Sequence, residues 1–243
     1  MKAVILAAGI ASRLRPLTDH KPKCLLEIGN KCLLERAIDG LLENNLRDIV
    51  IVTGYLQEQI ISFVSGHYPN LKVEFIYNGK YASTNNIYSL WLAGESVRDQ
   101  DILLLDSDIL FDPALLKAVL DSEYENSLAL NVHPLGEEEM KVIPDTRGKV
   151  LEISKICPIE QAIGESIGIE KMSRTYIRHL YEELDRLILN EGKANVFYEV
   201  AFERLISQGQ TFEIVDTTHF FSMELDTVED FKQAVQHIPA KLL

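Results

Sequence analysis

The first half of the chain alternates between short apolar runs and stretches in which apolar residues recur every three or four positions. The apolar runs have strand length and are Lys2–Ala7, Asp48–Thr53 and Ile102–Leu105, with a further strand predicted over Lys72–Tyr77. Runs without polar alternation are typical of strands buried on both faces of a sheet. The helical spacing predicts helices over Leu33–Asn44, Gln57–Val64 and Pro113–Leu120. This alternation indicates an α/β fold with a doubly wound, mostly parallel sheet.

Beyond Ser127 the pattern changes to shorter strands mixed with two longer helices. These helices are predicted over about Ser173–Asn190 and about Phe197–Gln208. No internal repeat, low-complexity tract or Ser/Gly/Pro-rich linker divides the chain. We therefore expect residues 1–243 to form a single domain.

The charge of the chain is negative overall but unevenly distributed. The 37 Asp and Glu against 24 Lys and Arg give a net charge of −13, which argues against a general nucleic-acid binder because phosphate backbones are held by clustered cations. Residues 1–36 depart from this balance, with seven Lys and Arg against three Asp and Glu. This basic segment calls for an anionic ligand or for solvation.

The cysteines and the N-terminal segment bear on the compartment. Three cysteines cannot pair completely, and none stands in a C-x-x-C arrangement, which favours a reducing compartment. Cys24 and Cys32 lie among leucines, where a free cysteine usually serves as a small core residue. The apolar run Ala3–Ala8 is short for a signal peptide, and no stretch has the length of a membrane span. We expect a cytoplasmic protein without membrane insertion.

A long loop, residues 7–23, follows the first predicted strand. It has neither the G-x-G-x-x-G pattern of dinucleotide sites nor the G-x-x-x-x-G-K-[ST] pattern of P-loops. It does contain Gly9 for close backbone approach, Ser12 as a donor, and the cations Arg13, Arg15, Lys21 and Lys23. Backbone N–H groups and several positive charges suit a triphosphate, and ligands bind beyond the carboxyl ends of such strands. The alternative is a solvated basic loop.

The order of residues in this loop is also familiar. Residues 6–23, L-A-A-G-I-A-S-R-L-R-P-L-T-D-H-K-P-K, resemble the signature L-A-A-G-x-G-[ST]-R-[LM]-x-P-x-T-x-x-x-P-K of nucleotidyltransferases. These enzymes have a Rossmann-like core, join a nucleoside triphosphate to a phosphorylated small molecule and release pyrophosphate. The resemblance implies that Arg13 holds the β- and γ-phosphates and the leaving pyrophosphate. It implies that Lys23 neutralises charge on the α-phosphate and on its nucleophile. The nucleotide would be lined by Leu6, Ala7, Ala8, Gly9 and Ser12.

One position departs from the signature. Ala11 stands where the family has its second glycine, and a methyl group there restricts positive φ or narrows the phosphate site.

Two acidic segments are candidates for a metal site. Asp106 and Asp108 follow the apolar strand that ends at Leu105, beside the first loop, and carboxylates in this position suit Mg²⁺. Asp226, in the segment M-E-L-D-T-V-E-D-F, has two interpretations. It is either a helix N-cap paired with Glu229 or, as the family's E-[IL]-D-T-x-E-D segment implies, the second metal ligand. We expect Asp108 and Asp226 to hold Mg²⁺, with Asp106 and Glu224 as further ligands or as neighbours that orient them.

The segment Tyr81–Ala93 bears on the choice of base. It lacks the Q-x-x-P-x-G pattern of sugar-1-phosphate enzymes and resembles the N-N-x-Y-S-L stretch of cytidylyltransferases that act on phosphocholine and related amines. The resemblance places Asn85 and Asn86 near the cytidine and Tyr88 near the acceptor. Alternatively, the two asparagines cap a helix, and Tyr88 and Trp91 are core residues.

Further candidates for the acceptor site lie in the second half. The family commonly places a lysine near the acceptor phosphate, which makes Lys155 a candidate; an exposed surface charge explains it equally well. Gly164 and Gly168 resemble the family's glycine-bearing strand that shapes the acceptor pocket. Aromatic faces and a carboxylate hold ammonium groups, and Phe197, Tyr198 and Glu199 offer both. The start of a helix with a core aromatic residue explains the same three residues equally well.

Taken together, the resemblance implies a Mg²⁺-dependent cytidylyltransferase that uses CTP and a small phosphorylated or phosphonylated amino alcohol. About residues 1–125 would form the nucleotide-binding core, and about residues 126–243 the acceptor-binding part with the second metal aspartate. The alternatives are a sugar- or inositol-1-phosphate nucleotidyltransferase and a non-catalytic nucleotide-binding subunit. The oligomeric state stays open, and a homodimer is one option.

Overall fold

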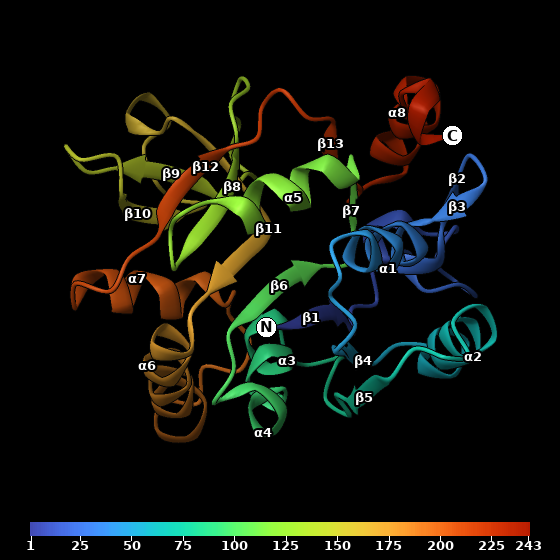
Figure 1. Ribbon diagram of the computed structural model, residues 1–243, viewed down its shortest axis with the longest axis horizontal. Coiled ribbons are helices and arrows are strands. Elements are labelled where there is room, and N and C mark those ends of the chain that lie inside the picture. Colours follow the sequence, from blue (N-terminus) through green and yellow to red (C-terminus); the bar gives the residue numbers. More distant parts are fainter.

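A nine-stranded sheet forms the centre of the computed structural model, which describes residues 1–243 (Figure 1). Its path runs β10-β9-β11-β6-β1-β4-β5, and β8 and β12 are joined to it through β11. The strands of the first half are β1 (Lys2–Ala7), β4 (Ile49–Thr53), β5 (Val73–Tyr77) and β6 (Ile102–Asp106). All neighbouring pairs among these four are parallel. The predicted α/β fold class is confirmed.

Alternate residues of the central strands enter two separate cores. Val4 and Val52 belong to one cluster, and Ile5 and Ile51 belong to the other. Each buried side chain of this size contributes about 1.5–3 kcal/mol relative to exposure. The helices that cover the second cluster are α1 (Leu33–Glu43), α2 (Gln57–His67) and α5 (Pro113–Asp121). The helices that cover the first are α3 (Asn86–Leu92), α4 (Gly94–Val97), α6 (Arg174–Asp185) and α7 (Glu199–Ser207).

The second half of the chain extends the same sheet. Its strands are β8 (Ser127–Asn131), β9 (Lys141–Pro144), β10 (Val150–Ser154), β11 (Gly164–Met172) and β12 (Glu213–Asp216). β11 pairs with β6 in antiparallel register, so that Ile169 lies opposite Leu105. This pairing makes the two halves continuous at the strand that ends in Asp106.

Short elements complete the fold. They are β2 (Glu27–Ile28), β3 (Lys31–Cys32), β7 (Ile109–Phe111), β13 (Ser222–Glu224), α8 (Val228–His237) and the 3₁₀ turns at Ser12–Leu14, Lys23–Leu25, Ile159–Gln161 and Ala240–Leu242. β13 pairs with β7, so that Glu224 lies opposite Ile109. The C-terminal segment thereby returns to the end of the central strands, near the N-terminal loop (Figure 1).

The predicted boundaries differ from the observed ones in informative places. β1 has the predicted bounds, because the apolar residues Ala3–Ala7 that follow Lys2 are all buried in the sheet. The long helix is regular only to Asp185 and continues as a π turn over Arg186–Asn190. The helix expected from Phe197 begins at Glu199, since Tyr198 is the residue before its first turn.

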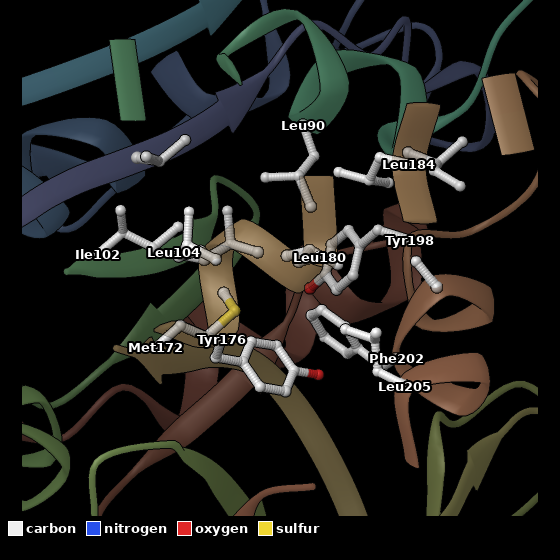
Figure 2. Packing of buried hydrophobic residues seen from close by; sticks show 14 of the residues in the cluster. Leu90, Ile102, Leu104, Met172, Tyr176, Leu180, Leu184, Tyr198, Phe202 and Leu205 are labelled. Carbon is white, nitrogen blue, oxygen red and sulfur yellow. The ribbon is translucent and has the colours of Figure 1, made fainter. Parts of the chain in front are cut away.

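An aromatic cluster fixes the start of α7. Figure 2 shows Tyr198, Phe202 and Leu205 packed toward Tyr176 and Leu180 of α6. The rings of Tyr198 and Phe202 lie 5.2 Å apart between centroids. The first turn of α7 is therefore held in place against the sheet.

Two further observations concern the cysteines and membranes. Cys24, Cys32 and Cys157 are free and buried, and Cys24 and Cys32 pack in the second core cluster as expected. None of the helices is both long and apolar enough to cross a membrane.

Candidate active site

A cleft of about 300 Å³ lies where β1 and β6 end. The predicted site residues that line it are Leu6, Ala7, Ala8, Gly9, Arg13, Lys23, Asn85, Asn86, Asp108, Lys155, Phe197, Glu199 and Asp226. Ser12, Tyr88 and Tyr198 are not part of its lining. The structure thus gathers residues from the start, middle and end of the chain around one cavity.

The loop after β1 has a left-handed backbone at Ala11, the position where the signature has glycine. Ala11 has φ 52° and ψ 51°, the left-handed region that glycine adopts freely. An L-residue there costs about 1–2 kcal/mol. The hydroxyl of Thr18 donates a 2.9 Å hydrogen bond to the Ala11 carbonyl, and the Tyr55 hydroxyl donates to the Thr18 carbonyl at 3.0 Å. The alanine therefore occupies a strained, left-handed backbone conformation.

Lys23 is the central cation of the cleft. Its Nζ donates to Oδ2 of Asp108 at 2.8 Å and to Oδ1 of Asp226 at 2.7 Å. Burial lowers the pKa of Lys23, but the two carboxylates outweigh that effect and raise it above its ordinary value. Arg13 forms a further ion pair with Asp226 and is more exposed than Lys23. Lys23 therefore stays charged, and its ammonium points at the end of β6.

Asp226 precedes the cap of α8 and is not the cap residue itself; its N–H donates a 3.1 Å hydrogen bond to Oδ2 of Asp230. The N–H of Leu225 donates a 3.0 Å hydrogen bond to the carbonyl of Asp108. The interpretation of Asp226 as an N-cap with Glu229 is wrong, because the N-cap of α8 is Thr227, which forms a capping box with Asp230. The side chain of Asp226 is thus free to face the cleft.

Three carboxylates meet at this point. One oxygen atom from each of Asp108, Glu224 and Asp226 lies within 4.8 Å of the others. Burial raises the pKa of Glu224, and the charges of Asp108 and Asp226 raise it further. A set of hard oxygen donors that already attracts a lysine ammonium has the chemistry that Mg²⁺ prefers. The residues fit a divalent cation.

Asp106, the last residue of β6, also lines the cleft beside these three carboxylates. It accepts a 3.1 Å hydrogen bond from the Tyr198 hydroxyl. Burial, followed by the charge of Asp108 and other neighbouring carboxylates, raises its pKa well above its ordinary value. Gly168 has φ 73°, and a Cβ at that position would lie 2.7 Å from Oδ2 of Asp106. Glycine is needed there because both the backbone angle and the space exclude a side chain.

The residues proposed for the acceptor divide into two groups. Lys155, Phe197 and Glu199 line the cleft, with the Lys155 Nζ 4.9 Å from the centre of the Phe197 ring. Burial raises the pKa of Glu199 to about 7. Tyr198 is fully buried, and its hydroxyl reaches Asp106 from behind the cleft. Its position favours a role in supporting Asp106.

Helix α3 shows why Tyr88 lies elsewhere. Asn85 is the N-cap, and its side chain accepts a 2.8 Å hydrogen bond from the Asn86 N–H. Asn86 and Ser89, three positions apart, face the cleft. Tyr88 and Trp91 share the neighbouring face, with ring centroids 5.4 Å apart. The helix phase therefore turns Tyr88 away from the acceptor position expected for it, whereas both asparagines line the cavity and Asn85 also caps the helix.

Several lining residues were not predicted from the sequence. Asn78 is buried and donates from Nδ2 to the Ser89 hydroxyl at 3.1 Å. It directly follows β5, so the rule that ligands lie beyond strand ends would have found it. Glu138 lies 3.6 Å from Arg13 and 3.7 Å from Lys155. No motif surrounds Glu138 or the lining residue Glu165, so no sequence signal marks them.

Comparisons with known proteins complete the description of the site. A family model described as nucleotidyl transferase matches residues 2–139. A CMP-5'-(3-aminopropyl)phosphonate synthase of Streptomyces rubellomurinus is 27% identical over 245 residues, covering 96% of this chain and 38% of that protein. A choline-phosphate cytidylyltransferase of Streptococcus pneumoniae is 41% identical over 107 residues, covering 44% of this chain and 45% of that protein. The matched part of each relative is thus less than half of its length.

A solved structure supports the fold. The structure of a CTP:phosphocholine cytidylyltransferase from Streptococcus pneumoniae superposes with a TM-score of 0.77 at 24% identity, covering 98% of this chain and 99% of the other. At this identity the similarity concerns the fold alone.

Proposed function

This chain belongs to the nucleotidyl transferase family, and from that premise we propose that it is a cytidylyltransferase. It transfers CMP from CTP to a small phosphorylated or phosphonylated amino alcohol and releases pyrophosphate. The observation that carries the proposal is the position of Lys23, which lies between Asp108 and Asp226 in the cleft beside the phosphate-binding loop. Similarity to a choline-phosphate cytidylyltransferase and to a CMP-aminopropylphosphonate synthase supports the choice of CTP and of the acceptor class.

The proposed reaction is an in-line substitution at the α-phosphorus of CTP. An oxygen of the acceptor's phosphate or phosphonate forms the new bond, and the bond from the α-phosphorus to the bridging oxygen breaks. The electron pair leaves with pyrophosphate. Because the acceptor oxygen is already ionised, no general base is required. Lys23 neutralises the charge that accumulates at the α-phosphate, and Arg13 holds the leaving group.

The same carboxylates would hold Mg²⁺. Asp108 and Asp226, with Glu224 within reach, are the proposed ligands, and the ion when bound would neutralise charge on the triphosphate. Lys23 donates to both of these aspartates. Its ammonium therefore lies where it can pair with these two carboxylates and, when the substrate is bound, with the α-phosphate.

Two alternatives are less well supported. If Ala11 distorted the loop, a non-catalytic subunit would be the better interpretation. Ala11 instead adopts the left-handed backbone conformation that glycine adopts freely. A sugar or inositol acceptor has no positive charge, whereas the acceptor end of the cleft contains the buried carboxylate Glu199. Both observations favour a catalytic protein with an amine acceptor.

A pyrophosphate-release screen tests the proposal. The four common ribonucleoside triphosphates are combined, with Mg²⁺ present, with phosphocholine, phosphoethanolamine, 2-aminoethylphosphonate, inositol phosphate and glucose-1-phosphate. We expect release with CTP and an amine acceptor. Release only with a sugar or inositol phosphate, or with no pair at all, would overturn the proposal.

A further inference from the structure

Two neighbouring carboxylates are buried at the acceptor end, where Glu199 lines the cleft and Glu170 does not. Glu199 is 7% exposed and Glu170 is 0% exposed. Oε2 of each is buried and has no hydrogen-bond partner. Lys155, the cation that lines this end, has its ion pair with Glu138 at 3.7 Å. A buried carboxylate oxygen without a donor is costly, so the free oxygen of Glu199, which lines the cleft, needs an explanation.

The protein supplies few donors to this group. The Tyr198 hydroxyl donates to Asp106 at 3.1 Å, and the Ser166 hydroxyl donates to Oε1 of Glu170 at 3.4 Å. Burial raises the pKa values of Glu170 and Glu199. A cation with N–H groups fits as the missing partner, because it would neutralise the charge of a carboxylate and donate hydrogen bonds to the free oxygens.

Aromatic surface is scarce in the same place. The aromatic side chains that line the cleft are Tyr81 and Phe197, and the Lys155 ammonium already lies 4.9 Å from the centre of the Phe197 ring. Tyr198 faces Asp106 with its hydroxyl and does not line the cavity. A quaternary ammonium binds to several aromatic faces and has no N–H to donate. The few aromatic side chains of this cleft therefore suit a quaternary ammonium group poorly.

We propose that Glu199, supported by Glu170 and Asp106, binds a primary ammonium group of the acceptor. The substrate class is then an aminoalkyl phosphate or phosphonate with a free –NH₃⁺, rather than a trimethylammonium compound. Lys155 lines the same cleft and offers a cation to the acceptor's anionic end. This inference rests on the proposed cytidylyl transfer and specifies its acceptor.

A matched set of acceptors tests it on the unmodified protein. With CTP and Mg²⁺, kcat/KM for pyrophosphate release is measured for 2-aminoethylphosphonate, its N,N,N-trimethyl derivative and 2-hydroxyethylphosphonate. We expect the primary amine to exceed both others by at least about tenfold, the order of one good charged contact. Equal or better turnover of the trimethyl or hydroxyl compound would overturn the inference and leave cytidylyl transfer intact.

Variants identify the carboxylate. Glu199→Gln should raise KM for 2-aminoethylphosphonate at least about tenfold while KM for CTP stays within about twofold. Glu160→Gln, at an exposed position outside the cleft lining, is the matched control and should leave both constants unchanged. An unchanged KM in Glu199→Gln would refute the role of Glu199. Thermal unfolding of both variants checks that they fold.

A binding measurement separates the two proposals. Calorimetric titration of the same three compounds into the wild-type protein, with and without CTP, does not require turnover. If no compound releases pyrophosphate, cytidylyl transfer fails. Selective binding of the primary amine would still support the ammonium site, whereas equal binding of all three compounds would refute it.

Discussion

The ammonium of Lys23 lies 2.7 Å from Oδ1 of Asp226, a residue 203 positions away in the sequence. Its second partner is Asp108 at 2.8 Å. One side chain thus connects the loop after β1, the end of β6 and the segment before α8. This position makes Lys23 the most direct test of the proposed chemistry.

Lys23→Ala should lower turnover much more than nucleotide affinity. Loss of one group that neutralises transition-state charge costs about 100- to 1000-fold in kcat. The phosphate-binding loop and Arg13 remain, so the Kd for CTP should change less. Steady-state pyrophosphate release and calorimetric CTP titration measure the two effects. Unchanged turnover would contradict the proposed mechanism.

Asp226→Asn should weaken divalent-cation binding. Removal of residues that only orient metal ligands already costs about 10- to 100-fold in affinity, so loss of a ligand should cost at least about tenfold. Mn²⁺ titration followed by electron paramagnetic resonance measures this without turnover. Glu229→Gln, on the exposed side of α8, is the control and should bind as the wild type does. Equal affinity in both variants would exclude Asp226 as a ligand.

Ala11→Gly should stabilise the protein. The left-handed backbone at Ala11 costs an alanine about 1–2 kcal/mol, and part of that gain is offset by the greater freedom of glycine in the unfolded chain. The net gain expected in the free energy of unfolding is about 0.5–1 kcal/mol, measured by urea denaturation. Ala82→Gly, at an exposed turn without positive φ, should instead lose stability. Similar losses in both variants would show that Ala11 carries no strain.

Stability should depend on pH through Glu199. Its pKa is raised from 4.5 to about 7, mainly by burial, with Lys155 opposing the shift and Glu203 adding to it. Glu199 also faces the carboxylates of Glu170 and Asp106. The folded form binds the proton more tightly, so this contribution is fully present below about pH 4.5 and is lost as the pH rises to about 7.

Glu199→Gln tests this pH dependence, because glutamine stays neutral throughout. We expect the variant to match the wild type near pH 4.5 and to exceed it near pH 8 by up to about 3 kcal/mol in the free energy of unfolding. Glu160→Gln, at an exposed position, is the control and should show no such difference. A Glu199→Gln effect that is the same at both pH values would rule out the raised pKa.

Two features could be predicted from the sequence for physical reasons. They are the parallel sheet and the convergence of Lys23 and Asp108 at one of its edges. β1 is so uniformly apolar that only a buried strand accommodates it. Lys23 and Asp108 lie at the ends of segments whose direction the parallel pairing determines. Such residues converge because all parallel strands of this sheet present the same end to one edge.

Side-chain direction was harder to predict. A shift of one residue in the helix start decides whether Tyr88 or Ser89 faces the cleft, and the cap at Asn85 makes that choice. Asp226 and Thr227 are adjacent and both suit a cap. Three hydrogen bonds between Thr227 and Asp230 select Thr227: its N–H and hydroxyl donate to the Asp230 carboxylate, and the Asp230 N–H donates to its hydroxyl. Glu138 reaches Arg13 only through tertiary folding. Contacts of this kind depend on the packing of distant segments, which no local pattern encodes.

The pairing of β13 with β7 has a consequence for protein synthesis. Residues 2–108, which include β1, β4, β5 and β6 as well as Lys23 and Asp108, leave the ribosome before β13 does. The hydrogen bond from Leu225 to Asp108 cannot form until the segment around Asp226 has also emerged. A nascent chain would thus carry the phosphate loop well before it carries the full set of carboxylates. During that interval Asp108 would be the only one of its two carboxylate partners available to Lys23, and the site would be completed once Asp226 has emerged.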